Sequence, residues 1–209
     1  MLTTSMVPAA RKESRRLMVV LHGLGDSMEG YGWLPQTLGL PWMNYLLVNA
    51  PDEYFGGYSW FDFEGDSKPG IDRSRVLLFD LIGDMAGRGY PVKEMTLFGF
   101  SQGSLMVLET GLRYPNVFAG LVCVSGFLTD PVGLANGLSP VAARQRLLVT
   151  HGTLDPLLRI DTVRPQIQDL QKRGLNIQWR EFAKEHTIAG EAEISLIRDF
   201  VSAGYPAAT

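Results

Sequence analysis

A serine with glycines two positions away on each side stands between a short apolar run and a helical pattern. The stretch LFGFSQGSLMVLE, residues 97–109, holds Ser101 between Gly99 and Gly103. The residues before the serine are typical of a buried strand, and the apolar residues after it recur at helical spacing. This strand–turn–helix pattern is the signature of a nucleophile elbow, whose tight turn needs neighbours without side chains. A glycine-rich loop in which Ser101 only caps the helix is the alternative.

A serine nucleophile needs a base within hydrogen-bond reach, and the base needs a group that orients it. The chain has three histidines: His22, His151 and His186. In proteins with this elbow the order along the chain is serine, acid, histidine, which excludes His22. His151 lies at the end of an apolar run, where it is better placed to anchor a loop. We therefore expect His186, in the loop AKEHTIAG, to be the base.

The acid is expected between Ser101 and His186, at the end of a strand. Asp155 follows the apolar run RLLVTHG in a tight loop that ends in Pro156. Asp130, which follows the preceding run, is the rival. The chain order and the short loop favour Asp155. Its role would be to hold the histidine in the correct tautomer and to stabilise the imidazolium.

Two backbone N–H groups are candidates for stabilising an oxyanion. In a nucleophile elbow one donor is the residue after the serine, here Gln102, and the other lies in the loop after an early strand. The stretch LMVVLHGLGDS supplies that loop, with Leu24 as the natural donor. Each such donor typically accounts for a factor of about 10²–10³ in rate.

The elements that must position these residues alternate along the chain. Apolar runs predict strands at 17–21, 45–50, 94–100, 118–126, 146–152 and 176–182, and helical patterns lie near 30–39, 72–87, 102–113, 160–173 and 190–203. Continuously apolar strands alternating with helices predict an α/β fold with a mostly parallel central sheet covered on both faces. The irregular stretches 51–70 and 127–144 both follow strands, so they are candidate walls of a pocket.

The composition argues against several classes of protein. The 209 residues are 45% hydrophobic, which fits one domain over residues 1–209. The net charge is −3 and the basic cluster at 11–16 is short, so nothing argues for nucleic acid. Cys123 is the sole cysteine, which excludes an internal disulfide and a cysteine metal site and fits the cytoplasm. No apolar run is long enough to span a bilayer, and we expect neither metal nor cofactor.

The chain resembles the α/β-hydrolase superfamily, specifically its small carboxylesterase, lysophospholipase and acyl-protein thioesterase family. The similar segments are LHGLGDS at 21–27, SWFDF at 59–63, GFSQGS at 99–104, HGTLDPLL at 151–158 and EH at 185–186. The resemblance implies an α/β-hydrolase fold with a minimal cap or none. By position it implies the triad Ser101, Asp155 and His186, the oxyanion donors Leu24 and Gln102, and an acyl pocket bordered by Trp60 and its neighbours.

Two positions depart from the family pattern, and the roles of several aromatic residues stay open. The segment FAKEH lacks the glycine that family members usually carry before the histidine, and Ser104 stands where a second glycine is common. Trp60, Phe61 and Phe63 lie in an irregular segment, where aromatic side chains either line an apolar pocket or cover an edge of the core. By the same argument Leu157 could contact an acyl chain.

The expected function is therefore hydrolysis of carboxylic esters or thioesters through an acyl-enzyme. Within that class the alternative is a lysophospholipase or acyl-protein thioesterase acting on long acyl chains. A non-catalytic binding protein on the same fold is an alternative from a different class. The complete set of candidate catalytic residues argues against it. A peptidase would need added elements for which 209 residues leave little room. The expected partner is a small-molecule or lipid ester, and an apolar rim around the pocket could serve a homodimer or a transient membrane contact.

Overall fold

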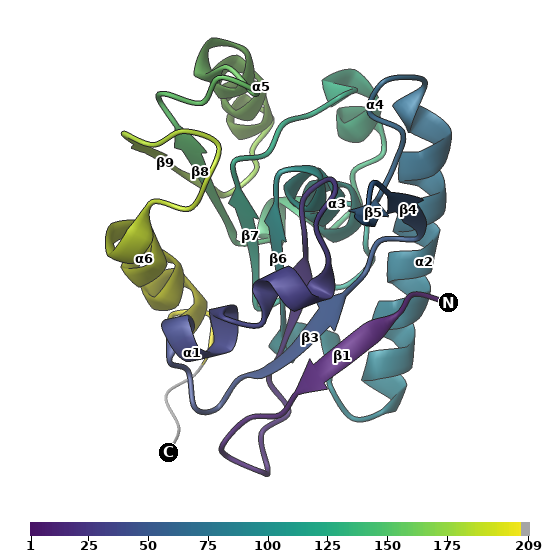
Figure 1. Ribbon diagram of the computed structural model, residues 1–209, viewed down its shortest axis with the longest axis vertical. Helices are drawn as coiled ribbons and strands as arrows, with labels where there is room; N and C mark the ends of the chain where they lie inside the picture. Colours follow the sequence, from purple (N-terminus) through teal and green to yellow (C-terminus); the bar gives the residue numbers. More distant parts are fainter. Residues whose placement is uncertain (206–209) are drawn as a thin grey trace.

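The computed structural model describes residues 1–205, and a seven-stranded sheet forms the centre of that part (Figure 1). The strand order is β1-β3-β2-β6-β7-β8-β9, and every neighbouring pair is parallel except β1 with β3. The bounds are β1 Thr4–Val7, β2 Leu17–Leu21, β3 Asn44–Val48, β6 Met95–Phe100, β7 Gly120–Val124, β8 Leu147–Gly152 and β9 Ile177–Phe182. Two further strands, β4 Asp52–Tyr54 and β5 Gly57–Ser59, form a separate hairpin. The predicted mostly parallel α/β sheet is confirmed.

Helices cover both faces of this sheet (Figure 1). Their bounds are α1 Leu34–Leu38, α2 Ser67–Gly87, α3 Gln102–Gly111, α4 Pro131–Asn136, α5 Ile160–Lys172 and α6 Gly190–Ser202, with 3₁₀ turns η1 Met28–Tyr31, η2 Val92–Glu94 and η3 Ala142–Arg144. The buried side chains of α2, α3 and α5 share one apolar cluster, and those of α1 and α6 share the other. Across residues 1–205 none of these helices combines the length and apolarity that crossing a bilayer requires.

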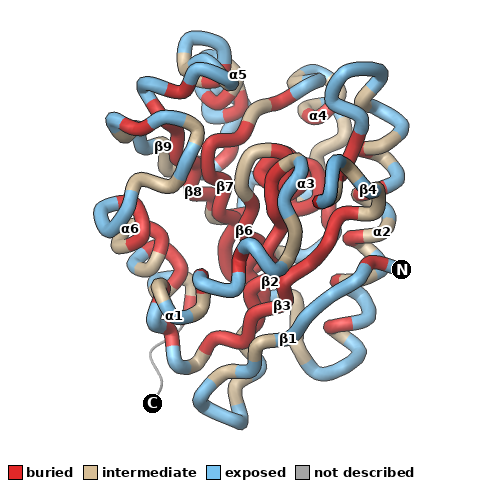
Figure 2. The backbone as a smooth tube through the Cα atoms, viewed as in Figure 1, coloured by how far each residue is buried: buried red, intermediate tan, exposed pale blue. Residues whose placement is uncertain are grey.

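Alternate strand residues supply the two clusters. In β2, Leu17, Val19 and Leu21 pack towards α2 and α3, whereas Met18 and Val20 pack towards α1 and α6. Side chains of a strand alternate between its faces, so a strand buried on both sides must be apolar throughout. Figure 2 shows the central strands as the buried part of the chain. Each fully buried aliphatic side chain contributes roughly 1.5–3 kcal/mol to folding, which makes this sheet a firm base for the loops at its edge.

Several short helices and strands were not predicted from the sequence, and some predicted helices have different bounds. β1 is antiparallel and mostly exposed, so it shows no apolar run. The hairpin β4–β5 lies in the stretch 51–70 and α4 in the stretch 127–144, and both consist of short elements that periodicity cannot detect. The helix predicted at 72–87 begins at Ser67, after Asp66 accepts the Lys68 N–H as a cap. The range 30–39 divides into η1 and α1.

Two glycines allow β6 and α3 to meet closely. A Cβ at Gly99 would lie 2.2 Å from the Gly103 carbonyl oxygen, and a Cβ at Gly103 would lie 2.2 Å from the Leu21 carbonyl oxygen. Leu21, at the end of β2, is also the register partner of Gly99 in β6. The loops that follow β2 and β6 are therefore held side by side at the carboxyl edge of the sheet.

We expect Gly103→Ala to destabilise the fold, because the added methyl group has no room beside the end of β2. Overpacking of this kind typically costs about 1–3 kcal/mol. Gly83→Ala in the middle of α2 is the matched control, since a Cβ there meets nothing within 4 Å. That control should stabilise the helix by about 0.5–1 kcal/mol. Urea unfolding measures both, and equal midpoints for the two variants would contradict this account.

Candidate active site

Ser101 occupies the turn between β6 and α3 with a strained backbone. Its φ of 54° and ψ of −117° lie on the left-handed side of the conformational map, which favours glycine. Such a conformation typically costs about 1–3 kcal/mol and persists where the surrounding structure holds it. The Ser101 N–H donates to the Val124 carbonyl at the end of β7, at 3.0 Å. The turn is thus braced against the neighbouring strand and presents the hydroxyl at the carboxyl edge of the sheet.

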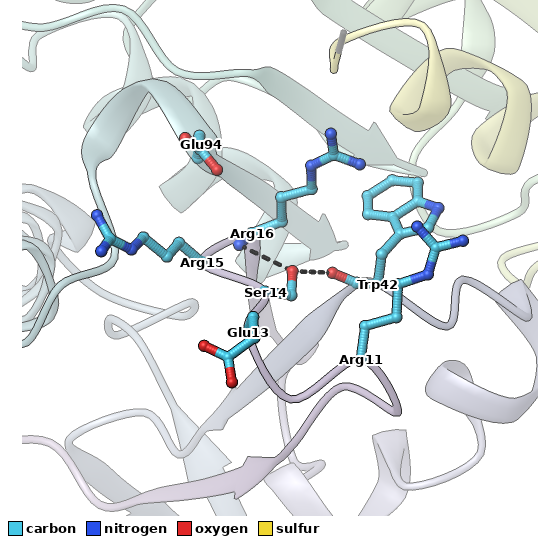
Figure 3. Close-up of a pocket in the computed structure, with 7 residues that line it drawn as sticks. All are labelled: Arg11, Glu13, Ser14, Arg15, Arg16, Trp42 and Glu94. Atoms are coloured by element: carbon cyan, nitrogen blue, oxygen red, sulfur yellow. Dashed lines mark hydrogen bonds between the residues drawn. The ribbon is translucent and has the colours of Figure 1, made fainter. Parts of the chain in front are cut away.

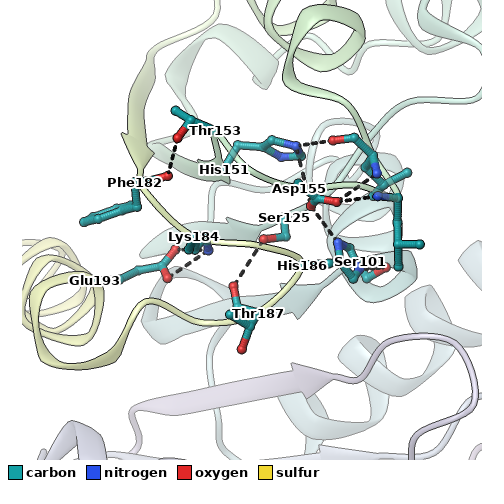
Figure 4. A network of polar contacts seen from close by, with 12 residues as sticks. Ser101, Ser125, His151, Thr153, Asp155, Phe182, Lys184, His186, Thr187 and Glu193 are labelled. Carbon is teal, nitrogen blue, oxygen red and sulfur yellow. Dashed lines mark hydrogen bonds and ion pairs between the residues drawn. The ribbon is translucent and has the colours of Figure 1, made fainter.

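A chain of two hydrogen bonds joins Ser101, His186 and Asp155 (Figure 4). Ser101 Oγ lies 2.9 Å from His186 Nε2, and His186 Nδ1 lies 2.7 Å from Asp155 Oδ2. An ionised carboxylate only accepts hydrogen bonds, so Nδ1 carries the proton and Nε2 offers its lone pair to the hydroxyl. The structure therefore brings together the three side chains that chain order predicts, from loops after β6, β8 and β9.

Asp155 is held in the turn after β8. Its Oδ1 accepts the N–H groups of Leu157 at 3.0 Å and Leu158 at 2.9 Å. Burial disfavours the charged carboxylate, but hydrogen bonds from these two N–H groups and the His186 ring outweigh it and lower the pKa of Asp155. The alternative acid, Asp130, is exposed. Its Oδ1 accepts the Gly133 N–H as the N-cap of α4, and it makes no hydrogen bond to His186.

The other two histidines anchor loops. His151 is fully buried, and its Nε2 lies 2.7 Å from the Leu158 carbonyl oxygen, to which it donates. His22 Nδ1 donates to the Gly23 carbonyl at 2.6 Å, and its Nε2 accepts the Ala50 N–H at 3.0 Å. Burial lowers the pKa of both rings, so they stay neutral and serve as fixed hydrogen-bonding groups.

A buried ion pair holds the loop that carries His186 (Figure 4). Lys184 Nζ lies 2.7 and 2.8 Å from the two carboxylate oxygens of Glu193 in α6, and both side chains are almost fully buried. The Lys184 carbonyl accepts the Leu154 N–H, and Ser125 Oγ donates to the Thr187 carbonyl. This pair could not be predicted from the sequence, because no periodic pattern links residues on either side of a loop.

The N–H groups of Leu24 and Gln102 lie at the same edge. Gln102 begins α3, whose first N–H groups have no partner inside the helix. Leu24 lies in the loop after β2, which two backbone hydrogen bonds of 2.9 Å tie to Tyr58. Within residues 1–205 neither N–H donates to another group. Both residues line the cavity beside Ser101, so their N–H groups are free to bind an oxygen there.

The Gln102 side chain braces the segment after β5. Its Oε1 accepts the Trp60 N–H at 3.0 Å, and its Nε2 donates to the Phe61 carbonyl at 2.9 Å. The Trp60 indole N–H donates in turn to the His22 carbonyl at 2.9 Å. The structure thereby corrects the expectation that Trp60 and Phe61 contact substrate, because both are fully buried and line no part of the cavity. They pack in the core and support the loop that carries Leu24.

An apolar cavity of about 310 Å³ opens beside Ser101. Its walls include Phe63, Phe127, Leu157 and Leu158. The rings of Phe63 and Phe127 meet edge to face, with centroids 6.0 Å apart. Leu157 is largely exposed and lines this cavity, which is consistent with the predicted contact to an acyl chain. We call this space the acyl cavity, because its lining suits an alkyl chain.

Most of the basic segment 11–16 lines a different cavity, which does not include Ser101 (Figure 3). It belongs to the loop that leads into β2, at the edge of the sheet opposite the carboxyl ends. Trp42 and Glu94 complete that lining, and the Ser14 hydroxyl bonds to the Trp42 carbonyl. No group of three or more potential metal ligands gathers anywhere in the described residues, 1–205.

Comparison with known proteins identifies the family of this chain and finds solved structures with the same fold. Residues 2–203 match the Phospholipase/Carboxylesterase family. Acyl-protein thioesterase 1 of Schizosaccharomyces pombe is 32% identical over 158 residues, which cover 68% of this chain and 69% of that protein.

Among solved structures, esterase PE8 superposes with a TM-score of 0.87 at 27% identity, covering 98% of this chain and 99% of the esterase. Acyl-protein thioesterase 2 of Zea mays has the same fold, with a TM-score of 0.80 at 23% identity over 97% of this chain and 98% of the maize chain. The hydrogen-bonded trio thus lies on an α/β-hydrolase scaffold.

We expect Gln102→Met to lower stability by about 1–3 kcal/mol, because it leaves the buried Trp60 N–H without a partner and the Phe61 carbonyl with the Ser59 hydroxyl alone. The apolar side chain keeps the volume of glutamine but offers no hydrogen bond. Gln168→Met, on an exposed position of α5, is the matched control and should change stability by less than about 0.5 kcal/mol. Thermal and urea unfolding measure the difference, and a neutral Gln102→Met would refute the bracing role.

Proposed function

We propose that this chain, which belongs to the phospholipase/carboxylesterase family of α/β-hydrolases, hydrolyses carboxylic esters and thioesters with a triad of Ser101, His186 and Asp155. Membership of this family indicates that the chain is a carboxylic ester hydrolase. It argues against the alternative of a non-catalytic binding protein. The observation that supports the triad is the unbroken hydrogen-bonded chain from the Ser101 hydroxyl to the buried carboxylate.

The proposed reaction begins when Ser101 Oγ attacks the carbonyl carbon of the substrate. His186 Nε2 accepts the hydroxyl proton as the new C–O bond forms. The carbonyl oxygen becomes an oxyanion that the N–H groups of Leu24 and Gln102 stabilise. The bond to the leaving oxygen or sulfur then breaks, and His186 returns its proton to that atom. The product of this half-reaction is an acyl-enzyme on Ser101 and a free alcohol or thiol.

Water completes the cycle by the same route. His186 takes a proton from the water as its oxygen attacks the acyl-enzyme, and the second oxyanion lies between the same two donors. The carboxylic acid leaves as Ser101 Oγ recovers its proton. Asp155 remains ionised throughout, because its lowered pKa keeps it charged while it orients the ring and stabilises the imidazolium.

The acyl cavity supports an acyl group with an apolar chain, and hence small-molecule or lipid esters as substrates. Thioesters are proposed as a second class because the relative from Schizosaccharomyces pombe is an acyl-protein thioesterase. Sulfur is a better leaving atom than oxygen, so the same groups suffice for both bonds.

We expect Ser101→Ala to lose about 10⁴-fold or more in kcat on p-nitrophenyl esters, because no other group can form the acyl-enzyme. Rates on the series from acetate to dodecanoate test this directly. Ser195→Ala, in α6 and outside the site, is the matched control and should retain the wild-type rate. Asp155→Asn should also lose several orders of magnitude while staying folded. A Ser101→Ala variant as active as wild type would overturn the proposed mechanism.

We expect Phe63→Ala to reduce kcat/KM for octanoate about fivefold relative to acetate. Phe63 forms an outer wall of the acyl cavity, so only a chain long enough to reach the ring loses apolar contact. Val76→Ala, on an exposed position of α2, controls for the loss of an exposed apolar side chain. The ratio of the two kcat/KM values is the measurement, and an unchanged ratio would remove Phe63 from the acyl-binding surface.

A further inference from the structure

Two cavities meet at His186. The acyl cavity lies on one side, and a second cavity of about 450 Å³ lies on the other. Asp26, Phe100 and His186 line both, whereas Ser101 lines only the acyl cavity. The second cavity is completed mainly by Tyr31, Trp33, Thr187 and Ile188. The imidazole therefore lies on the boundary between the two spaces.

The reaction geometry assigns a role to each space. In the tetrahedral intermediate the carbon holds Ser101 Oγ, the oxyanion, the acyl chain and the leaving group. The oxyanion points towards Leu24 and Gln102, and the acyl chain lies in the acyl cavity. The leaving atom must receive its proton from His186 Nε2, so the leaving group extends past the imidazole into the second cavity. We call this space the leaving-group cavity.

A carboxylate lies in the lining that the two cavities share. Asp26 Oδ1 accepts the Ser27 N–H at 2.7 Å, which leaves Oδ2 open to a ligand. A Cβ at Gly30 would lie 2.1 Å from Asp26 Oδ1, so the missing side chain at Gly30 makes the room that the carboxylate occupies. The Asp26 side chain is therefore held in place and faces the cavity with an exposed negative charge.

The rest of the leaving-group cavity suits a cation. Trp33 is 40% exposed, and its ring stacks on Tyr31 with centroids 6.2 Å apart. An exposed indole face attracts cations, and a nearby carboxylate adds to that attraction. The residues that line this cavity all belong to the described part of the chain, and none of them is lysine or arginine. An anionic leaving group would meet the Asp26 carboxylate there, with no lysine or arginine in the lining to offset that repulsion.

We propose that the leaving-group cavity binds alcohols or thiols that carry a positive charge, with Asp26 as the residue that determines this preference. The proposal rests on the proposed function, because it needs a leaving group at His186. An ammonium head on the leaving group would lie between the Asp26 carboxylate and the Trp33 ring.

Three thioesters with the same acyl group test the preference. Butyrylthiocholine releases a cationic thiol, S-butyryl-N-acetylcysteamine a neutral thiol and butyryl-coenzyme A an anionic thiol. All three thiols react with Ellman's reagent, and the protein's own Cys123 does not interfere because burial raises its pKa to about 12. We expect kcat/KM to fall in the order cationic, neutral, anionic. In Asp26→Asn the ratio of cationic to anionic kcat/KM should fall about tenfold.

Matched variants separate a local effect from a change in net charge. Asp84→Asn, on an exposed position of α2, removes the same charge elsewhere and should leave the ratio unchanged. Gly30→Ala should displace the Asp26 carboxylate and lower the ratio without removing any charge. Trp33→Leu should weaken the cationic substrate alone. An unchanged ratio in Asp26→Asn, or a preference of the wild type for the anionic thioester, would overturn the proposal. No turnover of any thioester or p-nitrophenyl ester would instead overturn the proposed function.

Discussion

The left-handed backbone at Ser101 is the constraint on which the rest of the site depends. A non-glycine residue holds this conformation only where its surroundings leave no alternative. Here Gly103 packs against the end of β2, and the Ser101 N–H bonds to the end of β7. The same close approach places the loop with Leu24 beside the first N–H groups of α3. One packing contact therefore positions the Ser101 hydroxyl and both candidate oxyanion donors together.

The remaining groups reach Ser101 because the sheet is parallel. The strands β6, β7, β8 and β9 are consecutive neighbours, so all their following loops gather at one edge. Asp155 is held there by backbone N–H groups, and His186 by the attachments of its own loop. The short side chain of Asp155 on its rigid turn can then reach the ring of His186 on its longer, tethered loop within hydrogen-bond distance.

Much of this arrangement could be predicted from the sequence, for identifiable reasons. Strands buried on both faces must be apolar throughout, so the central sheet was evident and its α/β class is confirmed. The elbow needs glycines at fixed spacing, and chain order singled out Asp155 and His186, which the structure brings to Ser101. The position of Trp60 could not be predicted from the residues, because an aromatic side chain in an irregular segment looks the same whether it lines a cavity or fills the core. The pair of Lys184 and Glu193 left no trace, because contacts between a loop and a helix have no period.

The burial of Lys184 and Glu193 has a consequence for how the site responds to heat. Hydration of charged groups becomes less favourable as temperature rises, so the cost of keeping this pair away from water falls on warming. Apolar contacts gain no comparable advantage over that range. The ion pair that tethers the His186 loop should therefore become less costly to keep buried as the protein warms. The alignment of the imidazole with Ser101 should consequently outlast the loosening of the more exposed loops, and activity should persist until cooperative melting.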